Sequence, residues 1–191
     1  MVPPLSLATG EEPTAPLAGT PRRSYRPRMP QPARADLSED KQARYRAVAG
    51  EIAAVLDGEP NRVARMATVA SVLSSAFETF FWTGFYVVDP DKPDELVVGP
   101  YQGTLGCLRI PFGSGVCGAA AASRKTRIVP DVHAFPGHIA CDSRSNSEIV
   151  VPVFGPDGAL IAVLDVDSTA FGAFDATDAE WLERIVARSF G

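Results

Sequence analysis

Residues Tyr101 to Glu148 read YQGTLGCLRIPFGSGVCGAAAASRKTRIVPDVHAFPGHIACDSRSNSE and form the irregular middle of the chain, around which the other segments are organised. This stretch holds every cysteine and both histidines of the chain: Cys107, Cys117, Cys141, His133 and His138. It also has the densest run of glycine, small residues and turn formers, whereas its flanks have the periodicity of amphipathic helices and apolar strands. If the protein performs chemistry, we expect it in this stretch and at sulfur.

The composition of the chain suits one globular domain with a sizeable core, because 46% of its 191 residues are hydrophobic and 21% are charged. The net charge of -5 argues against nucleic acid or an anionic membrane as a partner. No apolar run reaches the roughly 18 residues that span a bilayer, and no secretory signal is expected. Three cysteines are too few for a disulfide scaffold, so we expect thiols in a cytoplasmic protein.

The first 36 residues differ from the rest in composition. They contain eight prolines, few large apolar residues and a basic second half with five arginines. Such a segment buries too little apolar surface to offset the entropy of ordering it, so residues 1–36 are predicted to be a disordered Pro/Arg-rich extension. Targeting or docking is one role for this extension, and a dispensable tail is the other.

Residues 37–191 are predicted to form one folded domain. Helices are expected from Ser38 and from near Asn61, and a capping box at Thr177–Glu180 predicts the start of a last helix. The remaining elements are expected as strands at 82–88, 95–99, 104–110, 127–129, 148–154 and 159–167, a turn at 89–94, a helix at 116–123 and a long loop at 131–147. This order predicts an α+β domain with an antiparallel sheet flanked by helices.

The three cysteines have different surroundings in the sequence. Cys141 lies in the polar, histidine-containing run HIACD of the long loop, which is a better setting for a reactive thiolate than for a core residue. Cys117 lies in the apolar run VCGA, which favours a structural role, and Cys107 in a strand-like segment is undecided from spacing alone.

Other chemistries fit the sequence less well. No zinc-type pair such as C-x2-C or H-x3-H occurs, so no metal is expected. A hydrolase triad would combine Cys141 with a histidine and Asp131 or Asp142, but all of these lie in one loop, whereas triads are usually assembled from separate elements. The glycines of Gly113–Gly115 open a helix without a following lysine, which excludes a nucleotide-binding P-loop.

Two pairs of residues outside the central stretch share a strand face. Asp165 and Asp167 end an apolar strand two residues apart, so their carboxyl groups lie on the same side, and one of two such close acids tends to keep its proton. Glu148 opens the other strand of that hairpin and is expected near them. Trp82 and Tyr86 also share a face and predict either core or the wall of an apolar pocket.

Four motifs give the chain a family resemblance: TGFY at 83–86, RIPFGSGVCG at 109–118, VPDVHAFPGHIACD at 129–142 and SEIVVP at 147–152. They closely resemble the free methionine-(R)-sulfoxide reductases, which have the GAF fold. The resemblance runs from about Ser38 to Phe190 and implies an enzyme that reduces free methionine (R)-sulfoxide. The alternative from another class is a GAF module that binds a small molecule without turnover.

The resemblance also implies roles for individual residues. Cys141 would be the nucleophile and Cys107 the resolving thiol, while Cys117 would relay a disulfide or be structural. The residues that would bind the substrate are Trp82, Tyr86, Glu148, Asp165 and Asp167. By the same resemblance, thioredoxin would be the external reductant with no further cofactor, and the domain would form a homodimer through its helices.

Overall fold

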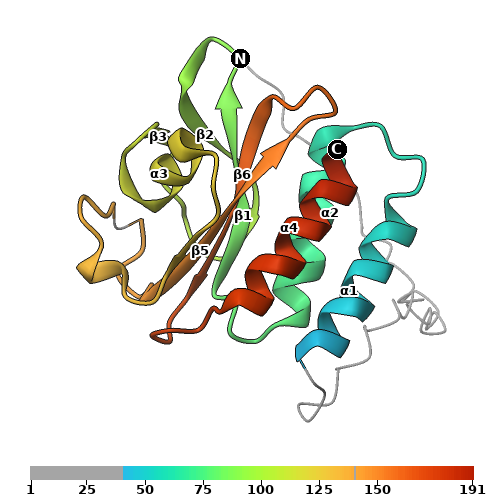
Figure 1. The fold of residues 1–191 in the computed structure, drawn as a ribbon, viewed down its shortest axis with the longest axis horizontal. Helices are drawn as coiled ribbons and strands as arrows, with labels where there is room; N and C mark the ends of the chain where they lie inside the picture. Colours follow the sequence, from blue (N-terminus) through green and yellow to red (C-terminus); the bar gives the residue numbers. More distant parts are fainter. Residues whose placement is uncertain (1–40, 140) are drawn as a thin grey trace, which may run out of the picture. The chain divides into compact units, whose positions relative to one another are not determined.

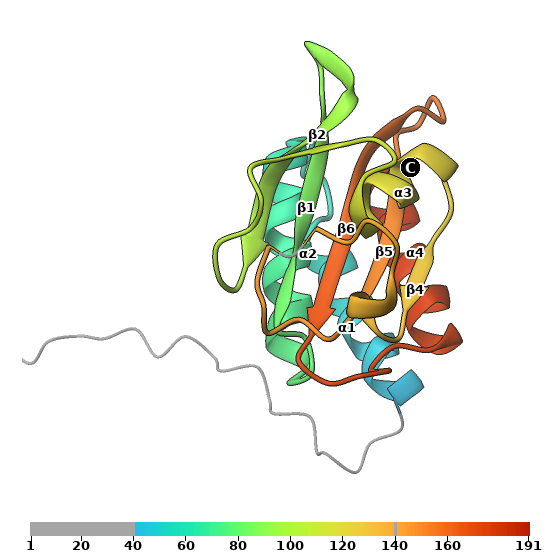
Figure 2. The ribbon, with the colours of Figure 1, turned by 90° about the vertical axis from the view of Figure 1, so that its left-hand side faces the viewer.

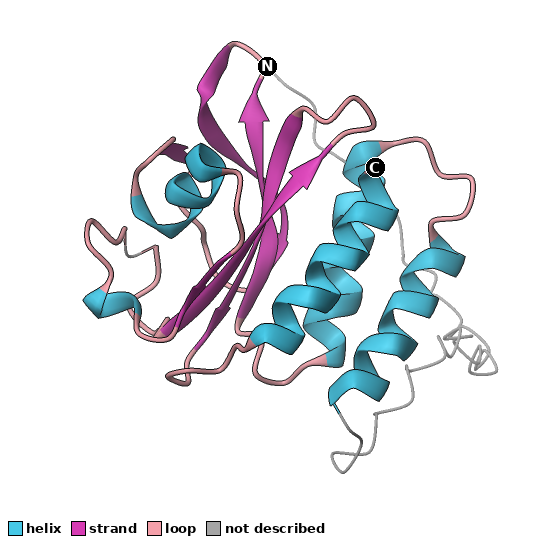
Figure 3. Cartoon of the chain, in the orientation of Figure 1, coloured by secondary structure: helices cyan, strands magenta, loops and turns pink. Residues whose placement is uncertain are grey.

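A computed structural model of the protein describes residues 41–139 and 141–191. The predicted disordered extension of residues 1–36 and the predicted helix start at Ser38 lie outside this range. The described part contains an antiparallel six-stranded sheet, whose strands are magenta in Figure 3. Its strands are β1 (Trp82–Asp89), β2 (Lys92–Gln102), β3 (Arg109–Pro111), β4 (Arg127–Val129), β5 (Ser147–Phe154) and β6 (Leu160–Ser168). Their order across the sheet is β3-β2-β1-β6-β5-β4. The predicted α+β class with an antiparallel sheet is therefore confirmed.

Three helices lie on one side of the sheet: α1 (Lys41–Val55), α2 (Arg62–Ala76) and α4 (Ala176–Phe190). Figures 1 and 2 show α2 and α4 next to the sheet, and Figure 1 shows α1 outside them, where it packs mainly against these two helices. The larger hydrophobic core lies between them and the sheet, and its fully buried members include Leu73 of α2, Phe85 of β1 and Leu182 of α4. The predicted start of the second helix is confirmed, because the Asn61 side chain accepts hydrogen bonds from the first amides of α2.

The opposite face carries α3 (Gly115–Ser123) and the irregular segments of the central stretch (Figure 2). A second apolar cluster fills the space beneath α3 and includes Trp82, Tyr86 and Val116. The helix lies very close to β3, since a Cβ atom on Gly118 would come within 2.3 Å of the Pro111 carbonyl oxygen. Only a glycine permits this approach, so Gly118 fixes how α3 packs.

Two predicted strands have different limits in the structure. The return strand expected at 95–99 is the longer β2, because Asp89 pairs with Lys92 across a tight turn and leaves little of the expected loop. The strand expected at 104–110 is reduced to β3. Residues 103–108 leave the sheet instead, with Leu105 and Leu108 exposed, and this departure brings Cys107 toward Cys141.

The capping box of α4 lies two residues earlier than predicted. Asp175 is the N-cap and accepts from the amides of Thr177 and Asp178, while the Asp178 side chain accepts from the Asp175 amide. The carboxyl group of Asp178 also accepts a hydrogen bond of 2.7 Å from Tyr45 and pairs with Lys41. The buried Asp178 therefore completes the capping box of α4 and ties the helix to α1 at the same time.

No helix among the described residues combines the length and the apolar character that crossing a membrane requires.

Candidate active site

The floor of the candidate site is a row of side chains across the middle of the sheet. Asp167 of β6 lies between Trp82 of β1 and Glu148 of β5 in the strand register. Asp165 lies two residue pairs away from Asp167 in the register of β6, next to Gly84 and Val150. Both aspartates line the same pocket, as the two-residue spacing predicts. Three strands thus hold the three carboxyl groups and Trp82 on a rigid, hydrogen-bonded surface.

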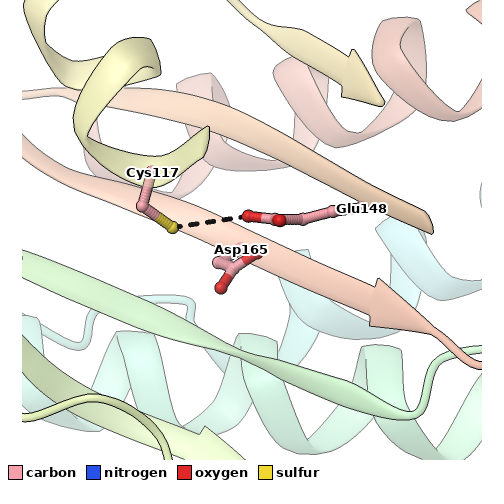
Figure 4. A group of neighbouring side chains, drawn as sticks. All are labelled: Cys117, Glu148 and Asp165. Atoms are coloured by element: carbon pink, nitrogen blue, oxygen red, sulfur yellow. Dashed lines mark hydrogen bonds between the residues drawn. The ribbon is translucent and has the colours of Figure 1, made fainter. Parts of the chain in front are cut away.

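The thiol of Cys117 closes over this floor from α3, as Figure 4 shows. Its Sγ atom lies 3.7 Å from Glu148 Oε1 in a buried hydrogen bond, and Asp165 lies beside the pair. Cys117 is a free, buried thiol. The sequence prediction of a structural setting for this cysteine was correct about its burial, but the thiol faces carboxyl groups rather than only apolar side chains.

Burial makes the carboxyl groups of the floor weak acids. Burial, with the charge of Asp167 adding to it, raises the pKa of Glu148 to about 8. Burial and then the nearby charge of Glu148 raise the pKa of Asp165 well above its usual range. The pKa of Asp167 is raised by burial only to about 6. At neutral pH, Glu148 and Asp165 therefore hold protons, whereas Asp167 is largely ionised.

Two further observations describe the polarity of the floor. Burial, followed by the charge of Asp165, raises the pKa of Cys117, so this thiol stays protonated at neutral pH. Within the described residues, Asp165 Oδ1 is buried and has no hydrogen-bond partner. Because buried polar atoms are nearly always bonded, this atom is placed to meet a polar group of a bound molecule.

The other two cysteines lie at the mouth of the pocket and form a disulfide. The Cα atoms of Cys107 and Cys141 are 5.3 Å apart, within the usual range for a bridge. The backbones of the two segments therefore need no rearrangement for these sulfurs to bond. Cys141 is exposed and lines the pocket, whereas Cys107 is half-buried behind it.

Aromatic rings form one wall of the pocket. Trp82 stacks on Tyr86 with ring centroids 5.6 Å apart and on Tyr101 with centroids 5.2 Å apart. The Tyr86 hydroxyl lies 4.0 Å from Cys141 Sγ, and Trp82 Nε1 donates a hydrogen bond of 2.9 Å to the Thr104 carbonyl oxygen. The wall therefore reaches from the carboxyl floor to the exposed sulfur.

The structure brings the predicted site residues together around one pocket. Seven of the eight line it, and Cys107 joins them through its bond to Cys141. Sequence reasoning missed Ser145, which is buried and hydrogen-bonds to Asp167, and Thr104, whose hydroxyl bonds to Asp142. Neither residue stands in a motif or a periodic pattern. Their contacts join loop segments, and no local signal in the sequence reports them.

The structure does not assemble the hydrolase triad that the residue types allowed. His133 Nε2 lies 2.9 Å from Asn146 Oδ1, and the Asp142 carboxylate bonds to Thr104 and Arg144. His138 lines the pocket, and burial lowers its pKa, so its imidazole is neutral at neutral pH. His133 and Asp142 are thus bonded to other side chains, and the buried Nδ1 of His138 has no hydrogen-bond partner within the described residues.

One group of side chains has the composition of a metal site. Cys117, Glu148 and Asp165 place their ligand atoms within 4.8 Å of one another. A thiol and two carboxyl groups could bind a divalent ion once they lose their protons, and in this structure Cys117 hydrogen-bonds to Glu148. The absence of a metal stays a prediction.

The fold and the pocket define a GAF domain whose mouth carries a pair of bonded cysteines. The family model for the GAF domain matches residues 64–188. The chain is 44% identical to the free methionine-R-sulfoxide reductase of Escherichia coli (strain K12) over 71% of this chain and 79% of the relative. It is 42% identical to the enzyme of the same name from Saccharomyces cerevisiae, over 68% and 74% of the two chains.

A solved structure gives the same result. The free methionine-R-sulfoxide reductase from Neisseria meningitidis, crystallised in complex with its substrate, is 51% identical to the chain, with a TM-score of 0.75. The match covers 80% of this chain and 89% of that one. The chain therefore belongs to the free methionine-R-sulfoxide reductases, a family of GAF-domain oxidoreductases, and the resemblance stated from its motifs is confirmed.

Proposed function

We propose that this protein reduces free L-methionine (R)-sulfoxide to methionine, with Cys141 as the nucleophile and an intramolecular disulfide as the oxidised product. The observation that carries the proposal is the pair of sulfurs at the mouth of a pocket whose floor holds protonated carboxyl groups. The names and the substrate complex of the related proteins support the choice of substrate.

The first step follows from the arrangement of sulfur and acid. The Cys141 thiolate attacks the sulfoxide sulfur while Glu148 or Asp165 gives a proton to the sulfoxide oxygen. The attack joins the Cys141 sulfur to the substrate sulfur. The protonated oxygen then transfers to the Cys141 sulfur as the sulfur–oxygen bond of the substrate and the new sulfur–sulfur bond break, which leaves Cys141 as a sulfenic acid and releases methionine. Because burial raises the pKa of both carboxyl groups, the proton is available at neutral pH.

The pocket also accounts for recognition of the free amino acid. Asp167, largely ionised at neutral pH, suits the ammonium group of the substrate, and the stacked rings of Trp82 and Tyr86 suit its S-methyl group. Carboxyl groups and a buried thiol close the inner end of the pocket, which leaves no exit for a continuing polypeptide. We therefore propose that methionine sulfoxide within proteins is not a substrate.

The oxidised enzyme is restored by thiol exchange. The Cys107 thiol attacks the sulfenic sulfur of Cys141, and water leaves as the disulfide forms. An external dithiol, for which we propose thioredoxin, then reduces the exposed bond by exchange. We further propose a homodimer formed through the helical face, where Val55 and Val63 are exposed. Light scattering of the purified protein tests this last point.

The test of the proposed function is a coupled assay with thioredoxin, thioredoxin reductase, NADPH and each epimer of free methionine sulfoxide. We expect NADPH consumption with the R epimer, and little with the S epimer or with a peptide that contains methionine sulfoxide. Cys141→Ser should abolish turnover, and Asp165→Asn should lower the rate by about a hundredfold or more, the usual worth of a positioned acid. Binding of the R epimer without release of methionine would instead identify a sensor module.

A further inference from the structure

We propose that the hydrogen bond between Thr104 and Asp142 is a positioning contact that holds the segments of Cys107 and Cys141 together when the disulfide is open. The inference rests on the proposed function and concerns its second step, formation of the disulfide from the sulfenic acid. In that step the Cys107 sulfur displaces oxygen from Cys141, the thiol proton leaves with the hydroxyl group as water, and one sulfur–sulfur bond forms.

The contact joins the two segments close to their sulfurs. Thr104 Oγ1 donates to Asp142 Oδ2 over 2.7 Å. Thr104 precedes Cys107 by three residues, and Asp142 directly follows Cys141. The hydrogen bond therefore runs parallel to the disulfide, between residues that are 38 positions apart. When reduction removes the covalent link, this polar link remains.

Both ends of the contact are anchored to the start of β1. The Thr104 carbonyl oxygen accepts from Trp82 Nε1 over 2.9 Å. The Asp142 carboxylate accepts from Arg144 Nε and a terminal guanidinium nitrogen, over 3.0 and 2.7 Å. The Arg144 guanidinium lies 4.7 Å from the centre of the Phe81 ring. Phe81 and Trp82 are adjacent in the sequence, so Thr104 and Asp142 are both held, directly or through Arg144, by the residues at the start of β1.

The two segments need such a contact because the sheet holds them only at a few points: Leu108 bonds to Val98, Asn146 to Ser168, and the Cys107 backbone to Tyr86. Between these points, residues 103–107, 135–139 and 141–145 form turns and irregular backbone, and Leu105 is exposed. The rate at which a thiol meets a sulfenic acid in one chain depends on how often the two groups are held at bonding distance. Arg144 and Thr104 hold the pKa of Asp142 below its usual range, so the acceptor stays charged throughout the working pH range.

The size of the effect follows from the kind of bond. A hydrogen bond to a charged acceptor is worth enough to change an equilibrium by about tenfold or more. Thr104→Val keeps the shape of the side chain and removes the donor. The effective concentration of the Cys107 and Cys141 thiols for each other should then fall by about tenfold, which is about 30 mV for a two-electron couple.

The first measurement needs no enzymatic activity. The Cys107–Cys141 disulfide is equilibrated with mixtures of reduced and oxidised glutathione, and its oxidised fraction is measured by thiol trapping. Thr104→Val should be the more easily reduced, and Thr104→Ser should return to the wild-type value. Thr126→Val is the matched control, because Thr126 Oγ1 donates to the Glu183 carboxylate and neither residue lines the pocket. A wild-type equilibrium for Thr104→Val, or an equal fall for Thr126→Val, overturns the proposal.

The second measurement separates the two chemical steps. Reduced protein is mixed with one equivalent of methionine (R)-sulfoxide, methionine release is followed, and the sulfenic acid is trapped with dimedone and detected by mass spectrometry. Thr104→Val should release methionine within about twofold of the wild-type rate and form the disulfide about tenfold more slowly, with more trapped acid. If Thr104→Val slows methionine release but not formation of the disulfide, the positioning role is overturned. If wild type releases no methionine, the proposed function fails, and the glutathione equilibrium still tests the contact.

Discussion

Replacing Glu148 by glutamine should change how the stability of the fold depends on pH. The pKa of Glu148 is raised from 4.5 to about 8, so between these values the folded protein keeps a proton that the unfolded chain has released. The stability linked to this proton is complete below about pH 4.5 and is lost as the pH rises through about 8. Across this window the free energy of unfolding falls by up to about 1.4 kcal/mol per pH unit.

The glutamine side chain does not titrate, so the variant lacks the contribution of Glu148 to the slope of the free energy of unfolding against pH. One independent group with this pKa would lower the free energy of unfolding by about 4 kcal/mol between about pH 5 and about pH 8. Asp165 and Asp167 share the protons of the site, so we expect about half of this, ~2 kcal/mol. Relative to wild type, Glu148→Gln should therefore be more stable at the alkaline end than at the acidic end, while it loses activity.

Urea unfolding at several pH values measures the effect, with the disulfide kept intact so that one redox state is compared. Glu51→Gln, an exposed carboxylate of α1, is the matched control and should keep the wild-type slope. If wild type and Glu148→Gln have slopes that agree within about 0.2 kcal/mol per pH unit, Glu148 holds no extra proton in the folded state, and the reasoning is refuted.

Three further outcomes are expected. The kcat/KM for the R epimer should fall about tenfold per pH unit above about pH 8, because Glu148 and Asp165 share the acid proton of the site and Glu148 loses its proton there. The residual methionine release of Glu148→Gln, measured in stopped assays, should not fall in this range. Asp178→Ala should lower the free energy of unfolding by about 3 kcal/mol, since it removes a helix cap and the buried acceptor of Tyr45; an unchanged urea midpoint would contradict this. Gly118→Ala should lower the free energy of unfolding by about 2–4 kcal/mol, because the added Cβ would meet a backbone oxygen at 2.3 Å. Gly50→Ala, which has open space around it in α1, should raise the free energy of unfolding by about 0.5–1 kcal/mol. Calorimetry of the two variants tests both expectations.

The sequence predicted well what local pattern controls. The alternation in β1 and β6 placed Trp82 with Tyr86 and Asp165 with Asp167 on shared faces, and the structure puts all four around one pocket. Strand spacing alone fixes such relations, because successive side chains alternate between the two faces. The resemblance then supplied the pairing of Cys107 with Cys141, which periodicity could not.

The errors occurred where contacts between distant segments decide the backbone. The apolar residues of 104–110 read as a strand, yet the disulfide and the bond from Thr104 to Asp142 draw this segment out of the sheet. At α4, Thr177 and Glu180 satisfied the capping pattern, but Asp175 and Asp178 satisfy it too, and the partner of Asp178 on α1 selects the earlier start. A pattern within four residues cannot contain that partner.

The floor of the pocket and its redox sulfurs belong to different kinds of structure. Glu148, Asp165, Asp167 and Trp82 stand on paired strands, whereas Cys107 and Cys141 stand on irregular segments that only reach over them. Binding of the substrate and its reduction therefore depend on different parts of the chain. A chain with serine at both loop positions would keep the receptor for methionine sulfoxide without consuming it, and calorimetry should find binding without methionine release. Such a protein would be a ready-made reporter of the oxidised amino acid.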